Sequence, residues 1–250
     1  MSAFKAWYGR PPGVDVGARE RQLIERVLPD LFGYHLVQLG CHHVEGLCDS
    51  SRIGHQVRIE LGHQLNPQAA LHCVEDALPL APNSVDVLVM PHVLEFASDP
   101  RRVLREAERV LVGEGHLVIV GFNPFSCYGV SSLLLRWQGA VPWSGRFIAL
   151  GRVKDWVQLL GFDVLRVERA VFRPPLSAAN LGRRLEFLER LGAYLWPALG
   201  AVYVLVARKR VEGLTPLRAS WRQRRRLVPG GVVEPTVRAG RAAEERRHGA

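Results

Sequence analysis

Residues 37–46, VQLGCHHVEG, have side chains that could support two kinds of chemistry. An apolar run that ends in a glycine is typical of a strand followed by a ligand-binding loop. Cys41, His42 and His43, by contrast, have side chains that bind zinc. Zinc sites favour two short ligand pairs of the C-x2-C or H-x3-H kind, and no such set of pairs occurs here. The sequence therefore favours a ligand loop, and we predict no metal site.

The elements around this loop follow from the apolar pattern, which alternates between strand and helix periods. Strands are predicted at 35–39, 56–61, 70–74, 85–90, 116–122, 163–171 and 201–207. Helices are predicted at 17–32, from Pro100 onward with Asp99 as N-cap, and before Gly161. The run VDVLVM at 85–90 is nearly all apolar, as in a strand buried on both faces of a parallel sheet. Alternating strands and helices predict an α/β fold with a mainly parallel sheet.

The carboxyl ends of the predicted strands are the expected ligand site, because ligands of such sheets bind at that edge. The residues at these ends are Gly40, Glu60, Glu75, Asp76, Met90, His92, Phe122 and Asn123. Imidazole titrates near neutral pH, so His92 is the candidate general base. Phe122 directly precedes an irregular, aromatic insert at 123–150 and Asn123 begins it, and both are candidate substrate contacts.

The positive charge of the chain is concentrated at its end. From Arg208 onward there are twelve Lys/Arg and four Asp/Glu, which leaves 21 basic and 20 acidic residues in the rest of the chain. Residues 211–250 are expected to be a basic, disordered tail. Clustered arginine attracts nucleic acid or an anionic surface, but a solvated tail is the favoured reading, since only one aromatic residue, Trp221, lies among the charges.

The expected location is the cytoplasm. The N-terminus has no apolar signal segment, and the four cysteines lack a dense disulfide-like spacing. The uncharged stretch 191–207 is interrupted by Pro197 and Gly200 and ends in a β-rich run, so we expect a buried strand there and no membrane span.

The stretch Leu78 to Phe122 resembles a known family. Its ordered elements are LPL, VDVLVM, HVLEF, DP and EAERVLVGEG followed by an apolar strand. This order is similar to that of the class I S-adenosylmethionine-dependent methyltransferases of type eleven. Three further segments, HQV at 55–57, GFNP at 121–124 and VARKR at 206–210, resemble a narrower bacterial branch, the YafS-like methyltransferases.

The resemblance implies a Rossmann-like sheet of seven strands with helices on both faces and an antiparallel last strand. It places an N-terminal arm at 1–16, the methyltransferase-like domain at 17–210 and a substrate-side insert at 123–150. It also implies S-adenosylmethionine as cofactor and an unknown methyl acceptor, with a small molecule favoured over a macromolecule.

The same resemblance assigns roles to the strand ends. Glu60 occupies the position of the carboxylate that binds both ribose hydroxyls, and Glu75 or Asp76 could contact the adenine amine. Gly40, Met90 and His92 are the remaining expected cofactor contacts, with His92 beside the sulfonium.

The loop after the first strand departs from the family pattern D-x-G-x-G-x-G. Gln38 stands for the acid, Gly40 keeps the first glycine, and His42 and Val44 replace the next two. LCDSSRIG is poor helix material, so the first crossover helix is expected to be short or missing. Two hypotheses stay open: an active methyltransferase, and a catalytically silent binding protein of the same fold that uses its basic tail.

Overall fold

The structure is a computed structural model that describes residues 2–40, 46–61, 71–73, 77–135, 137, 142–175, 194 and 196–211. The chain divides into two units, Met1–Glu212 and Gly213–Ala250. The predicted tail lies outside the described residues from residue 212 onward. The account below therefore concerns the first unit.

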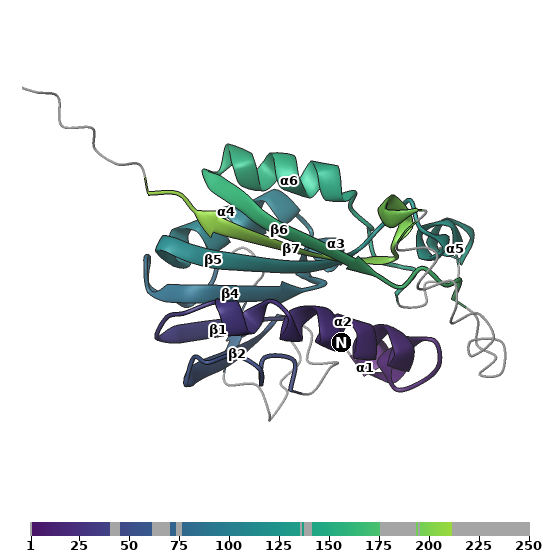
Figure 1. Cartoon of the computed structure of the whole chain (residues 1–250), viewed down its shortest axis with the longest axis horizontal. Coiled ribbons are helices and arrows are strands. Elements are labelled where there is room, and N and C mark those ends of the chain that lie inside the picture. Colours follow the sequence, from purple (N-terminus) through teal and green to yellow (C-terminus); the bar gives the residue numbers. More distant parts are fainter. Residues whose placement is uncertain are drawn as a thin grey trace, which may run out of the picture. The chain divides into compact units, whose positions relative to one another are not determined.

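The core of this unit is one seven-stranded sheet of order β3-β2-β1-β4-β5-β7-β6 (Figure 1). Its strands are β1 (His35–Leu39), β2 (His55–Leu61), β3 (Leu71–Cys73), β4 (Val85–Pro91), β5 (Leu111–Phe122), β6 (Phe162–Ala170) and β7 (Val202–Lys209). The pairs from β3 to β5 are parallel, and β7 runs antiparallel to both β5 and β6. The mainly parallel sheet with an antiparallel last strand is confirmed.

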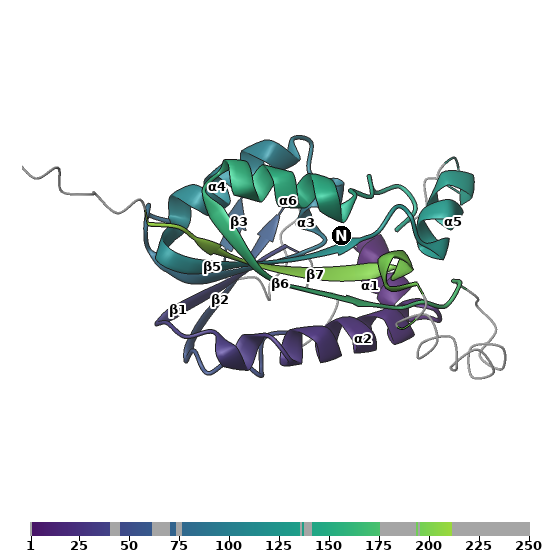
Figure 2. The same cartoon turned by 45° about the horizontal axis from the view of Figure 1, so that its top comes forward.

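Helices cover both faces of the sheet, with α2 on one face and α4 and α6 on the other (Figure 2). The helices are α1 (Ser2–Tyr8), α2 (Gly13–Glu25), α3 (Val93–Phe96), α4 (Pro100–Val110), α5 (Cys127–Leu135) and α6 (Leu150–Leu159), with short 3-10 turns η1 (Leu28–Asp30) and η3 (Pro197–Leu199). Successive side chains of a strand point to opposite faces. Accordingly, Val87 and Val89 pack in the cluster that contains α2, whereas Leu88 and Met90 pack with α4 and α6.

Three elements differ from their predicted limits. α2 ends at Glu25 and is followed by the 3-10 turn η1, because Pro29 lacks the N–H that would continue the helix. β5 begins at Leu111, directly after α4, and a register shift opposite Val85 and Val87 accommodates the glycines between 112 and 116. The N-terminal arm contains the helix α1, whose Phe4 and Tyr8 are buried.

Two negative predictions can be compared with the described residues. Residues 46–54 contain turns and no helix, as the sequence of this crossover indicated. The stretch suspected of spanning a membrane ends in β7, which is buried between β5 and β6. In the described part of the chain, no helix is both long enough and apolar enough to cross a membrane.

The start of α4 supplies a test of local stability. Asp99 Oδ1 accepts hydrogen bonds from the N–H groups of Arg101 at 3.0 Å and Arg102 at 3.3 Å. Asp99→Ala removes this N-cap and should lower the free energy of unfolding by about 1 kcal/mol, measured by urea denaturation. Asp99→Asn keeps an acceptor oxygen, so its free energy of unfolding should fall much less. Equal losses in both variants would show that the charge, 4.0 Å from Arg105, matters more than the cap.

Candidate functional site

The carboxyl ends of β1 and β2 meet at the predicted ligand edge. Gly40 follows β1 with φ +79°, a conformation that glycine adopts without strain and other residues rarely adopt. Its N–H donates to the carbonyl of Ile59 at 2.8 Å, which ties the start of the loop to β2. The surviving glycine is therefore required by the backbone, and it lies beside the residue that follows Ile59, which is Glu60.

Glu60 has a buried carboxylate oxygen that finds no donor among the described residues. The residue is 6% exposed, and no described residue hydrogen-bonds to its Oε2. A buried acceptor without a partner costs roughly 1–3 kcal/mol, so such a group is expected to be satisfied by a ligand or water. Two vicinal hydroxyls, as in a ribose, would supply two donors to one carboxylate. The site therefore fits the sugar of a nucleoside cofactor.

Gln38 stands where the family has an acid and is used within the fold. It is buried, and its Oε1 accepts a hydrogen bond from the Cys48 thiol at 3.6 Å. Burial raises the pKa of Cys48 to about 12, so the thiol stays protonated as a donor. Gln56 Nε2 donates to the carbonyls of Cys48 and Ile53 at 3.3 and 3.1 Å. These bonds hold residues 48–53 against β1 and β2.

His92 follows β4 and lies in a cluster of buried polar groups. It has φ 54° and no exposed surface. Its Nε2 is 2.9 Å from Glu20 Oε1, and its Nδ1 is 2.7 Å from Glu95 Oε2. The Tyr8 hydroxyl donates to Glu20 Oε1 at 2.9 Å, and the Phe122 N–H donates to Glu95 Oε1. The cluster thus joins α1, α2, α3, β4 and β5.

The charges of this cluster favour a protonated His92, which does not suit the predicted role of general base. Burial by itself lowers the pKa of His92, but the carboxylates of Glu20 and Glu95 outweigh burial and raise the pKa to about 10. Burial raises the pKa of Glu95, and the neighbouring imidazole opposes that rise. A protonated, fully buried imidazole with both nitrogens paired cannot accept a proton from a substrate. In this conformation His92 is buried and paired on both nitrogens, so the structure does not place it as a general base or against a cofactor, and its predicted roles stay predictions.

Aromatic rings enclose the same cluster. The ring centroids of Phe4 and Phe122 lie 5.8 and 4.4 Å from that of His92. Phe122 also stacks on Phe147 at 5.0 Å, and its side chain is fully buried. The predicted substrate contact of Phe122 is consequently replaced by packing around His92.

Two further predicted contacts are also engaged in the fold. Met90 is fully buried in the core cluster that contains α4 and α6, so its side chain does not face a ligand. Asn123 Nδ2 donates to the carbonyls of Ala198 at 2.8 Å and Gly200 at 3.0 Å, and its Oδ1 accepts from the Phe125 N–H. Asn123 thus ties the end of β5 to the segment before β7, which is a positioning role.

Four residues of the predicted site lie outside the described residues, namely Glu75, Asp76, His42 and Val44. His35 and His55 contact each other, with their Nδ1 atoms 3.0 Å apart at the amino ends of β1 and β2. Within the described ranges, no three His, Cys, Asp or Glu side chains gather closely enough to hold a metal ion.

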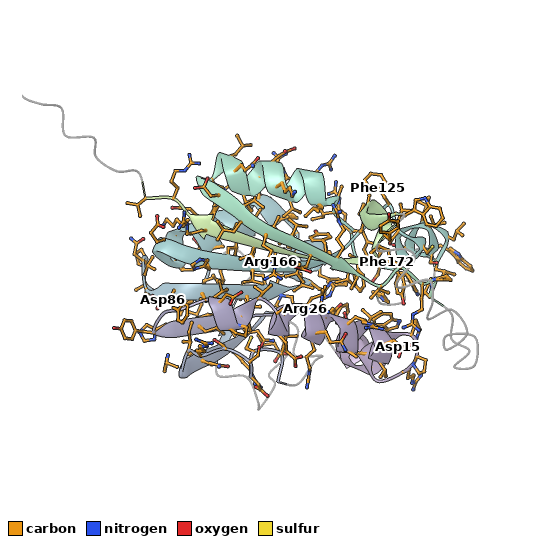
Figure 3. The ribbon with its side chains drawn as sticks, in the orientation of Figure 1. Asp15, Arg26, Asp86, Phe125, Arg166 and Phe172 are labelled. Atoms are coloured by element: carbon orange, nitrogen blue, oxygen red, sulfur yellow. The ribbon has the colours of Figure 1, made fainter. Side chains whose placement is uncertain are left out.

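A cavity of about 480 Å³ adjoins the end of β5, beside α5. Its lining consists of Phe125, Ser126, Cys127, Val130, Phe172, Pro174, Trp196 and Leu199. Figure 3 shows Phe125 and Phe172 at the end of the sheet where α5 lies, with Asp86 of β4 at the opposite end. The cavity is therefore at the same edge as the carboxyl ends of the parallel strands.

The sequence did not identify Tyr8, Glu20 and Glu95 as members of the site. One signal was available, because Glu20 interrupts the apolar helical series formed by Val16, Leu23 and Ile24. A carboxylate on the buried face of a helix implies a buried partner. The identity of that partner depends on packing between elements that are far apart in the sequence.

Comparisons with known proteins agree with this geometry. Residues 34–119 match the family model described as methyltransferase domain. The Escherichia coli protein YafS is 37% identical over 205 residues, which cover 80% of each chain. The solved structure of a SAM-dependent methyltransferase from Thermotoga maritima has a TM-score of 0.59 at 19% identity and covers 78% of this chain and 89% of its own. One from Mesorhizobium loti has a TM-score of 0.52 at 18% identity, covering 75% and 96%.

The two solved structures show the shared fold, and the similarity to YafS extends over most of both sequences. The chain belongs to the class I S-adenosylmethionine-dependent methyltransferases of type eleven, in the branch that contains YafS.

Proposed function

We propose that the protein transfers a methyl group from S-adenosylmethionine to an acceptor that enters beside α5. The observation that carries this proposal is the buried Oε2 of Glu60, which has no donor among the described residues and lies next to Gly40. The cofactor supplies a methyl group that is already activated as a sulfonium. The protein then has mainly to align the two reactants and exclude water.

Within this proposal, Glu60 holds the ribose and Gly40 allows the backbone to turn toward it. The amide of Gln38 carries no charge, and its Oε1 already accepts from Cys48. Compared with a family member that has an acid here, the chain offers less electrostatic attraction to the amino end of the cofactor. Glu60 should therefore account for a large share of the binding affinity.

Within this proposal, the buried cluster around His92 positions structural elements and does not take part in the chemistry. It holds α1 and α2 against the ends of β4 and β5, and it keeps both ring nitrogens of His92 paired with carboxylates. We infer an in-line transfer driven by alignment, without a proton acceptor at His92.

The alternative of a silent binding protein is favoured by one observation, the engagement of Gln38 with Cys48 where the family keeps an acid. On this reading, residues 211–250 would bind an anionic partner, which remains a prediction from the sequence. If the protein transfers a radioactive methyl group from S-adenosylmethionine to any extracted acceptor, the silent alternative is excluded.

The cofactor site can be tested with S-adenosylhomocysteine, the demethylated cofactor, by calorimetric titration. The full chain should bind it with one-to-one stoichiometry. Glu60→Ala should weaken binding about 10- to 100-fold, because hydrogen bonds to a charged group contribute about 1.5–3 kcal/mol. Glu60→Gln keeps one acceptor oxygen, so its affinity should lie between those of the native chain and Glu60→Ala.

Asp155→Ala, which removes an exposed carboxylate from α6, is the matched control and should bind as the native chain does. Absence of binding by the native chain at millimolar ligand would overturn the proposed function. Equal affinity of the native chain and Glu60→Ala would remove Glu60 from the site.

The charge cluster predicts a specific dependence of stability on pH. The pKa of His92 rises from 6.5 to about 10 on folding, so its stabilising effect is complete below pH 6.5 and is lost as the pH rises through 10. The free energy of unfolding, measured by urea denaturation, should therefore fall between pH 6.5 and 9.5. His92→Asn tolerates the positive φ but leaves Glu20 and Glu95 without a cation, and should be less stable by about 3–5 kcal/mol.

Glu20→Gln provides a milder variant if His92→Asn does not fold. It removes one of the two carboxylates that raise the pKa of His92, so the fall in stability should still begin near pH 6.5 but end at a lower pH and be smaller in total. A pH dependence identical in the native chain and in Glu20→Gln would show that the cluster does not hold a charged imidazole.

A further inference from the structure

We propose that the cavity beside α5 binds the methyl acceptor, and that this acceptor is a small uncharged molecule with an aromatic or hydrocarbon body. The inference rests on the proposed methyl transfer and names the substrate class. Ligand sites are typically cavities of roughly 300–1,000 Å³, lined mostly by apolar groups. The cavity has about 480 Å³ and therefore has room for a molecule of one or a few rings.

The described residues of the lining offer almost no polar partner. Three of their side chains are aromatic, namely Phe125, Phe172 and Trp196, and none of the described lining side chains is charged. The hydroxyl of Ser126 is already used, because it donates to the carbonyl of Asn123 at 2.7 Å and accepts from the Gly129 N–H at 3.2 Å. A charged ligand would lose its water here without gaining a hydrogen bond, which disfavours it strongly.

The wall of the cavity around Leu199 is hydrogen-bonded to the end of the sheet. Asn123 donates to the carbonyls of Ala198 and Gly200, which flank the lining residue Leu199. The Asn123 N–H donates to the carbonyl of Ala201 at 2.7 Å, and the Ala201 N–H donates to that of Val171 at 2.8 Å. The wall is thus bound to the ends of both β5 and β6.

Backbone strain occurs on the same wall. Val171 has φ 64°, a conformation that a β-branched residue rarely adopts. Its side chain is buried, and its carbonyl accepts from Ala201, so the surrounding structure holds it in this state. Such strain persists where packing imposes it and is common at ligand sites. The next residue, Phe172, lines the cavity.

The position of the cavity connects it to the cofactor edge. The lining residue Phe125 comes three residues after Phe122, the last residue of β5. The ring of Phe122 contacts His92, which follows β4. Val130 lines the cavity and is 57% exposed, whereas Leu133, one turn further along α5, is 79% exposed and does not line it. These two residues permit a matched comparison on one helix.

The test uses N-phenyl-1-naphthylamine, an uncharged aromatic dye whose fluorescence rises in apolar surroundings, titrated into the full chain. Val130→Glu places a carboxylate at the cavity and should weaken dye binding about tenfold or more. Leu133→Glu makes the same change in charge on the same helix and should weaken binding less than about twofold. 8-Anilinonaphthalene-1-sulfonate, which has the same rings as the dye and adds a sulfonate charge, should bind at least about tenfold more weakly than the dye.

The inference is overturned if the native chain does not bind the dye at about 100 µM, a concentration well above a micromolar Kd. Equal weakening by Val130→Glu and Leu133→Glu would also overturn it, because it would indicate adsorption to exposed apolar surface. Calorimetry with S-adenosylhomocysteine separates this result from the proposed function. Retained cofactor binding without dye binding refutes the acceptor class alone, whereas loss of cofactor binding by the native chain refutes the methyl transfer.

Discussion

A buried imidazolium held between two carboxylates organises the ligand end of this molecule. His92 meets Glu20 of α2 on one nitrogen and Glu95 of α3 on the other, and Tyr8 of α1 and the backbone of β5 complete the cluster. Removing these charges from water is costly, and their mutual attraction offsets that cost only while all partners stay in place. The interaction therefore fixes where the N-terminal helices lie relative to the ends of the central strands.

This constraint explains how polar groups are distributed along the edge. Gln38, His92 and Asn123 are all buried and all use their polar atoms within the fold. Glu60 differs, because one of its oxygens is buried without a donor among the described residues. Next to this polar edge, the cavity beside α5 is almost wholly apolar. The molecule thus separates a hydrogen-bonding surface suited to a nucleoside from a surface suited to an uncharged body.

Much of the fold could be predicted because local patterns determined it. The apolar run at 85–90 became the buried strand β4, and Asp99 caps α4. The candidate site was predicted less well. Strand ends locate an edge of the sheet, but they do not reveal which side chains at that edge are already satisfied by partners. Asn123 and Phe122 were found at the right edge and turned out to serve its construction.

The sequence alone determined the class of fold, the order of its elements and the edge of the sheet where a ligand is expected, because periodicity and capping act over a few residues. Tertiary structure decided the role of each polar residue at that edge. His92 has an ordinary imidazole in the sequence, and the approach of Glu20 from 72 residues away, together with Glu95, turns it into a buried cation. Likewise, the cavity joins Phe125, Phe172 and Trp196 from three separate segments. Protonation and enclosure depend on neighbours in space, which a linear pattern does not specify.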